Sequence, residues 1–309
     1  MQSKTFTIED HAGVEIFVRK WEPKSDVEVR GIVQIAHGLG EHSARYEHVA
    51  KTLTDAGYIV YADDHRGHGK TAESLDKAGV LGPGGWEGTV RAMKNVTEKI
   101  IEEKSNDDLP VFLLGHSWGS YMSQDYTQEY ADLIDGLILS GTNGKQPMLG
   151  ILSFIGKLVT KIKGAETKAK LLDKVVMQPL NKPFEPARTD FDWLSRDEEV
   201  VDQYIEDPWC GFVLPNGFFI EMAKGLKKIW KPESEKKIPK DLPIYLFTGG
   251  QDPTNNMGEG MEILYERYKK MGIKDLSKNV YENARHETLN ETNKEQVKQD
   301  LIDWLNEHS

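Results

Sequence analysis

A serine stands at the centre of a Gly-x-Ser-x-Gly pattern at residues 115–119, directly after the apolar run Val111–Leu114. A strand that turns sharply into a helix at such a pattern, the nucleophile elbow, holds its serine in a strained backbone conformation. Gly115 and Gly119 fit this turn because a Cβ at either position would press on the crossing strand and helix. Ser117 would then lie at a helix N-terminus, which favours developing negative charge. Taken alone, the pattern also fits a glycine-rich turn with a serine N-cap.

The partners of the serine decide between these interpretations. A serine hydroxyl becomes a good nucleophile when a histidine accepts its proton and a carboxylate orients that histidine. In proteins with this elbow, the acid and then the histidine follow the serine along the chain. Of the nine histidines, only His286 and His308 come after Ser117. His308 is the penultimate residue, where a helix frays. We therefore predict that His286 is the base, although alone it would also fit an ordinary surface loop.

The carboxylate is expected at the end of the strand before that histidine. A Gly-Gly-x-Asp-Pro segment at residues 249–253 directly follows the apolar run Ile244–Thr248. Such a segment is by itself an ordinary turn signal, but together with the serine and the histidine it makes Asp252 the predicted acid. Glu287 and Asp275 are weaker alternatives because neither lies at an appropriate strand end.

Ester or amide hydrolysis also needs hydrogen-bond donors aimed at the oxyanion of the tetrahedral intermediate. The backbone N–H of Trp118, just after the serine, is the first expected donor. The second should come from the glycine-rich loop at residues 37–40, and we assign it to the N–H of Leu39. Gly38 lets the backbone approach the substrate, so Gly38 and Trp118 are the predicted substrate contacts. His37 is expected to be structural.

The surrounding elements must bring these distant residues together. Apolar runs and amphipathic segments alternate along the chain, which predicts a parallel, doubly wound sheet with right-handed crossovers. Ligands of such sheets bind beyond the C-terminal ends of the strands, where the 37–40 loop and Ser117 both fall. The expected strands are 5–8 and 14–21 as a hairpin, then 30–36, 58–62, 111–114, 134–140, 242–248 and 277–281. The expected helices are 43–56, 86–104, 258–271 and 294–306.

The alternation stops between residues 141 and 241, where helical periodicity and prolines dominate. We predict the first part of an α/β core at 1–140, a helical cap at 141–241 and the rest of the core, with the acid and the histidine, at 242–309. Residues 141–186 hold eight lysines and three acidic residues. The apolar residues of 148–162 lie within this basic segment. The pattern fits transient contact with a lipid surface, and equally a cap helix that packs inward.

Composition limits the possible functions of the chain. Its 309 residues, 38% of them hydrophobic, are enough for one large α/β core with an insertion. A net charge of −11 argues against nucleic-acid binding. The single cysteine, Cys210, excludes an intrachain disulfide and a cluster of several thiolates. The start of the sequence lacks an apolar leader, and no apolar run is long enough to span a membrane, so we expect a cytoplasmic protein of undetermined oligomeric state.

Five motifs together resemble the monoacylglycerol lipase and lysophospholipase branch of the α/β-hydrolase superfamily, related to the serine aminopeptidase-type hydrolases. They are His-Gly-Leu-Gly-Glu-His at 37–42 with Arg45-Tyr46, Asp-His-Arg-Gly-His-Gly at 64–69, Gly-His-Ser-Trp-Gly-Ser at 115–120, Gly-Gly-Gln-Asp-Pro at 249–253 and Ala-Arg-His-Glu at 284–287. The resemblance implies the α/β-hydrolase fold, with about eight mostly parallel strands, helices on both faces and a helical cap inserted after the sixth strand. It also implies an acyl-enzyme mechanism with no metal or organic cofactor. Trp118 departs from the family pattern, which often has methionine there, and its indole could narrow the acyl pocket.

The residues and the resemblance together predict a serine esterase that cleaves monoacylglycerols, lysophospholipids or similar small acyl esters. A serine peptidase is the nearest alternative, but proline-releasing relatives are expected to carry Pro in the oxyanion loop, where this chain has His-Gly-Leu-Gly-Glu at 37–41. A non-hydrolytic binding protein on the same fold is a second alternative, and it has no need of all three triad residues. Asp64, Arg66, His68 and Thr71 are expected to form a polar network near the site.

Overall fold

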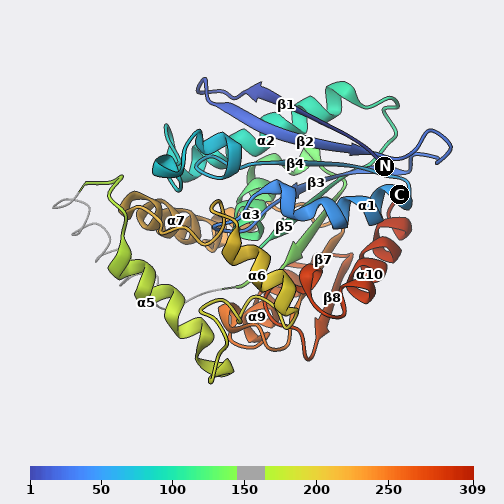
Figure 1. The fold of residues 1–309 in the computed structure, drawn as a ribbon. Coiled ribbons are helices and arrows are strands. Elements are labelled where there is room, and N and C mark those ends of the chain that lie inside the picture. Colours follow the sequence, from blue (N-terminus) through green and yellow to red (C-terminus); the bar gives the residue numbers. More distant parts are fainter. Residues whose placement is uncertain (145–163) are drawn as a thin grey trace.

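The predicted alternation of strands and helices folds into one mostly parallel, eight-stranded sheet with the order β1-β2-β4-β3-β5-β6-β7-β8. The computed structural model describes residues 1–144 and 164–309 (Figure 1). The strands are β1 Gln2–Glu9, β2 Glu15–Glu22, β3 Gly31–Ala36, β4 Tyr58–Asp63, β5 Val111–His116, β6 Gly136–Ser140, β7 Ile244–Gly249 and β8 Leu276–Tyr281. The first two strands form the predicted hairpin, and β4 through β8 in the sheet order run parallel.

The central strands are apolar on both sides because helices cover both faces of the sheet. In β5, Leu113 points into one core cluster, whereas Phe112 and Leu114 point into the other. The first cluster contains side chains of α2 (Gly85–Glu103), α3 (Trp118–Tyr130) and α9 (Glu259–Met271). The second contains side chains of α1 (Glu47–Asp55) and α10 (Lys294–Glu307). The helix expected from residue 43 starts as a 3₁₀ turn, η1 (Ser43–Tyr46), and becomes α-helical at α1.

Helices joined by loops make up the described part of the segment between β6 and β7. They are α5 (Lys170–Asn181), α6 (Glu198–Glu206), α7 (Asn216–Ile229) and the short α8 (Pro232–Glu235). Within residues 164–241, no strand joins the sheet. In Figure 1, α5 and α7 project beyond one end of the strands, and α7 packs on α2 and α3. We refer to this segment as the cap; its predicted bounds, 141 and 241, stay a prediction.

The predicted apolar face at residues 148–162 lies outside the described residues. None of the helices in the described ranges is long and apolar enough to cross a membrane.

Candidate active site

Ser117 lies at a sharp turn between β5 and α3, with φ 52° and ψ −117°. A positive φ is uncommon for any residue other than glycine, and such strain is found at functional sites. The flanking glycines make the turn possible. A Cβ on Gly119 would collide with the carbonyl oxygen of Ala36 at the end of β3. A Cβ on Gly115 would lie 2.7 Å from the backbone of α3. The turn therefore requires both glycines of the pattern, because strand and helix approach too closely for a side chain.

The structure brings the three predicted triad residues into one hydrogen-bonded line. His286 Nε2 lies 2.8 Å from Ser117 Oγ, and His286 Nδ1 lies 2.8 Å from Asp252 Oδ2. Asp252 is completely buried after β7, and its other oxygen accepts hydrogen bonds from the Thr254 backbone N–H (2.9 Å) and hydroxyl (2.7 Å). The Thr248 hydroxyl donates to Oδ2 at 3.3 Å. This order of contacts can pass a proton from the serine to the histidine while the carboxylate holds the ring.

The electrostatics of the pair suit a base oriented by an anion. Burial alone would raise the pKa of Asp252, but the His286 imidazole and the Thr254 donors hold it below its ordinary value. Burial alone would lower the pKa of His286, but Asp252, together with Glu287 and Glu41, raises it above its ordinary value. The pKa of the nearby buried ring of His116 shifts in the opposite direction, because burial and the charge of His286 lower it to about 4. Asp252 is therefore an anion at neutral pH, and His286 holds a proton more readily than an ordinary histidine does.

We expect kcat/KM for phenyl acetate to fall as the pH drops through the pKa of His286, because only the neutral imidazole can accept the serine proton. The raised pKa places the midpoint above the ordinary histidine value of about 6.5. Hydrolysis followed by pH-stat checks this, with tryptophan fluorescence recorded in the same buffers to exclude unfolding. A midpoint below about 6 would contradict the raised pKa.

Two backbone amides, those of Leu39 and Trp118, are the predicted oxyanion donors. Within residues 1–144 and 164–309, neither the Leu39 nor the Trp118 amide donates a hydrogen bond to another group of the protein. The amide of Gly38 is different, because it donates to Glu41 Oε1 at 2.5 Å. A Cβ on Gly38 would lie 3.2 Å from Ser117 Cβ, so the glycine keeps this space open. The predicted substrate contact of Gly38 would therefore be made through its Cα and not its N–H.

A largely buried guanidinium connects the oxyanion loop to the loop that carries the histidine. Arg45 donates to Glu41 Oε2 at 2.6 Å and to both oxygens of Glu287 at 2.7 Å. Tyr46 adds a hydroxyl donor to Glu41 at 2.9 Å. Although burial would raise it, the pKa of Glu287 falls to about 2 because of Arg45. Glu41 accepts the Gly38 amide, and Glu287 directly follows His286. The guanidinium therefore links the oxyanion loop to the loop that carries the histidine. Sequence reasoning did not assign this role to Arg45.

We expect Arg45→Met to lower the free energy of unfolding by about 3–5 kcal/mol, because it leaves two carboxylates buried without a counter-charge. Urea denaturation followed by circular dichroism measures the change. Arg188→Met is the matched control, since Arg188 pairs with Asp202 at the surface and its loss should change stability far less. An Arg45→Met protein as stable as the parent would contradict the ion-pair assignment.

The weaker acid candidates and the predicted polar network have other partners. Glu287 binds Arg45, and Asp275 lies 3.1 Å from His308, the histidine that sequence reasoning set aside.

The predicted polar network is not connected as expected. The Asp64 carboxylate accepts from the Ser43 and Lys70 amides, and the Arg66 guanidinium pairs with Asp10. Of the four side chains, only that of His68 bonds within the group, to the backbone oxygen of Arg66, whereas the Thr71 hydroxyl accepts from the Phe17 amide. They fasten separate loops because each meets a different neighbour in the tertiary structure.

Two tryptophans border the triad in different ways. The Trp118 indole is buried, lies 5.0 Å from the His68 ring and 5.1 Å from the Phe218 ring of α7, and its Nε1 has no partner among the described residues. Its effect on the acyl pocket stays a prediction. Trp193, from the cap, lies 5.2 Å from the His286 ring, and its carbonyl oxygen accepts the His286 amide at 3.4 Å. No sequence signal marked Trp193, because it follows no motif.

The fold and this arrangement define an α/β-hydrolase. A family model described as serine aminopeptidase, S33, matches residues 27–293. The chain belongs to this family. The predicted fold class is thereby confirmed, as is the resemblance from which it was inferred.

Individual relatives point to acyl esters. A monoacylglycerol lipase of Mycolicibacterium smegmatis is 29% identical over 308 residues, covering 96% of this chain and 94% of that protein. A highly thermostable carboxyl esterase from Bacillus coagulans, solved in complex with glycerol, is 30% identical with a TM-score of 0.90, covering 100% of this chain and 99% of that one. The monoacylglycerol lipase of Paleococcus ferrophilus is 26% identical with a TM-score of 0.71, covering 96% and 100%.

Proposed function

We propose that this protein is a serine hydrolase that cleaves monoacylglycerols and similar small acyl esters through an acyl-Ser117 intermediate. The observation that carries the proposal is the continuous contact from Ser117 Oγ through His286 to buried Asp252. Similarity over nearly the whole chain to a monoacylglycerol lipase and a carboxyl esterase supports an ester as the substrate.

In the proposed mechanism each residue has one role. Ser117 Oγ attacks the ester carbonyl while His286 Nε2 takes its proton, and the carbonyl oxygen becomes an oxyanion held by the Leu39 and Trp118 amides. Collapse of this intermediate expels the alcohol, which leaves with the proton from His286. A water molecule then gives its proton to the same nitrogen and attacks the acyl-serine. The second collapse releases the fatty acid and returns the proton to Ser117 Oγ, with Asp252 stabilising the imidazolium in both halves.

The alternatives have less support. The family description names an aminopeptidase, but the two relatives that cover 96% and 100% of the chain are named a monoacylglycerol lipase and a carboxyl esterase. The oxyanion loop has leucine at position 39 and no proline. A binding protein without turnover would not require a strained serine whose hydroxyl contacts an oriented histidine. Neither alternative is favoured by these comparisons.

A covalent probe and a substrate panel test the proposal. A fluorophosphonate should label the protein at Ser117, and peptide mapping should locate the adduct there. Purified enzyme should release fatty acid from monoacylglycerols and p-nitrophenyl esters, assayed from C2 to C16 beside lysophosphatidylcholine, and should leave aminoacyl p-nitroanilides intact. Absence of labelling would favour a binding protein, and faster anilide cleavage would favour a peptidase.

Transient contact with lipid stays part of the proposal, and α5 supports it. Leu171 is 74% exposed and Val175 is 55% exposed, one helical turn apart, beside Lys170 and Lys174. Exposed apolar side chains flanked by lysines fit an anionic interface. We expect weak binding to anionic vesicles that disappears at high salt. Vesicle co-sedimentation measures this binding, with the Lys170→Glu/Lys174→Glu variant as the comparison. If binding and activity do not change with salt or with the presence of vesicles, the cap acts only as a lid.

A cytoplasmic location likewise stays a prediction, which cell fractionation would test.

A further inference from the structure

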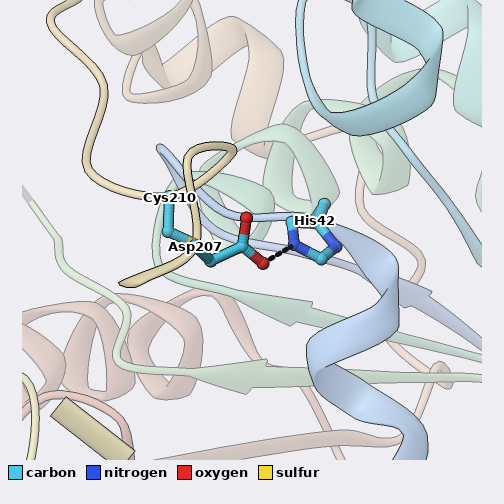
Figure 2. Close-up of side chains that lie close together, drawn as sticks. All are labelled: His42, Asp207 and Cys210. Atoms are coloured by element: carbon cyan, nitrogen blue, oxygen red, sulfur yellow. Dashed lines mark hydrogen bonds and ion pairs between the residues drawn. The ribbon is translucent and has the colours of Figure 1, made fainter. Parts of the chain in front are cut away.

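Three side chains of types that can bind metal ions lie close together where the cap contacts the loop that follows β3. Figure 2 shows His42, Asp207 and Cys210 close together. His42 Nε2 lies 2.8 Å from Asp207 Oδ2, and the nitrogen, oxygen and sulfur donor atoms of the three residues all lie within 4.8 Å of one another. His42 precedes η1 in the core, whereas Asp207 and Cys210 follow α6 in the cap. We call these three residues the 42/207/210 cluster.

The donor set of the 42/207/210 cluster matches the preferences of zinc. Zn²⁺ binds imidazole, carboxylate and thiolate, with bonds of about 2.0–2.3 Å that place tetrahedral ligands about 3.5 Å apart. Rotation of the Asp207 and Cys210 side chains, which share one short loop, would close the remaining distance. One thiolate, one carboxylate and a neutral imidazole also cancel the two charges of the ion, so the occupied site would be neutral.

The charges around the 42/207/210 cluster are compatible with a cation. The Arg45 guanidinium lies nearby, but it is already paired with the buried carboxylates of Glu41 and Glu287, so the three groups together carry a net negative charge. Cys210 is the only cysteine of the chain, so no intrachain disulfide competes for its sulfur.

A water-accessible space adjoins the 42/207/210 cluster. All three residues line a cavity of about 500 Å³ between the core and α6, together with His48 and Lys294. The cavity gives an ion a way in and leaves room for water as a fourth ligand, which completes a tetrahedral shell. It is lined by none of Ser117, Asp252 and His286, so the cluster is separate from the proposed active site.

We propose that His42, Asp207 and Cys210 form a zinc site that fastens the cap to the oxyanion loop. The same junction already holds two direct hydrogen bonds, because Gly211 N–H and the Tyr204 hydroxyl both donate to Gly40 O at 2.9 Å. Gly40 follows Leu39, the proposed oxyanion donor. An ion shared by core and cap would therefore stiffen the contact beside that donor and raise the temperature at which the cap separates from the core.

The test is metal binding to the full chain, and its result does not depend on whether the protein hydrolyses esters. Protein stripped with a chelator is titrated with zinc sulfate against a chromophoric competitor, and with Co²⁺ as a spectroscopic probe. We expect one zinc per chain, a thiolate-to-cobalt charge-transfer band in the near ultraviolet, and a higher Tm with zinc. Cys210→Ser should abolish the band and weaken zinc binding at least about 100-fold, and His42→Gln should weaken it comparably.

Two variants control for other sites. His48→Gln changes a histidine of the same cavity outside the 42/207/210 cluster, and His286→Gln removes the triad imidazole; both should bind zinc as the parent does. Circular dichroism without metal shows whether each variant is folded. The proposal is overturned if the folded parent binds no zinc at micromolar concentrations, if its cobalt complex lacks the thiolate band, or if His286→Gln and not Cys210→Ser abolishes binding.

Discussion

Ser117→Ala is expected to lower kcat for p-nitrophenyl esters by about 10⁴- to 10⁶-fold, the range found when the nucleophile of such a triad is removed. The alanine lacks the Oγ that lies 2.8 Å from His286 Nε2, so no acyl-enzyme can form. The fold should persist, because alanine meets the same strain at φ 52° and Ser117 Oγ bonds only to His286 among the described residues. We expect the free energy of unfolding to change by less than about 1 kcal/mol.

Initial rates combined with active-site titration give kcat, and the Tm shows whether each variant is folded. Ser277→Ala on β8 is a matched control, since its hydroxyl has no hydrogen-bond partner in the described structure. That control should keep the activity of the parent. If Ser117→Ala retains more than about a hundredth of the parental kcat while folded, Ser117 is not the nucleophile.

Asp252→Asn is expected to lower kcat by about 10⁴-fold at neutral pH, because it reverses the tautomer of His286. The amide oxygen should take the place of Oδ1, which accepts from the Thr254 N–H and hydroxyl. The NH₂ group then faces His286 Nδ1, which must become an acceptor and leave its proton on Nε2. A protonated Nε2 cannot take the serine proton. KM should change little, because Asp252 is buried away from the substrate.

The two weaker acid candidates supply the comparison. Asp275→Asn makes the same chemical change at a carboxylate that pairs with His308, and it should leave kcat within about twofold of the parent. Glu287→Gln tests the other candidate, whose carboxylate binds Arg45. A large loss of kcat in folded Glu287→Gln, together with an active Asp252→Asn, would transfer the orienting role to Glu287.

Much of the fold was predictable because its signals are local. The apolar runs at 111–114 and 244–248 have the length and composition of buried strands, and the structure places β5 and β7 there. The elbow was equally predictable, because Gly115 and Gly119 are required where strand and helix approach closely. Chain order then selected His286 and Asp252, because a parallel sheet brings the C-terminal ends of its strands to one edge.

Contacts between residues far apart in the sequence could not be predicted in this way. Arg45 and Glu287 are separated by 242 positions, and nothing in either segment indicates that they pair. The cap is similar, because Trp193 lies between α5 and α6 in the sequence and contacts His286 only in the folded chain. Periodicity and backbone sterics are local, so the alternation of strands and helices and the residue types at the strand ends could be inferred from the amino-acid order. The partners of desolvated groups depend on packing in three dimensions, so the folded structure was needed to show which buried charges neutralise one another and which cap residue lies against the histidine.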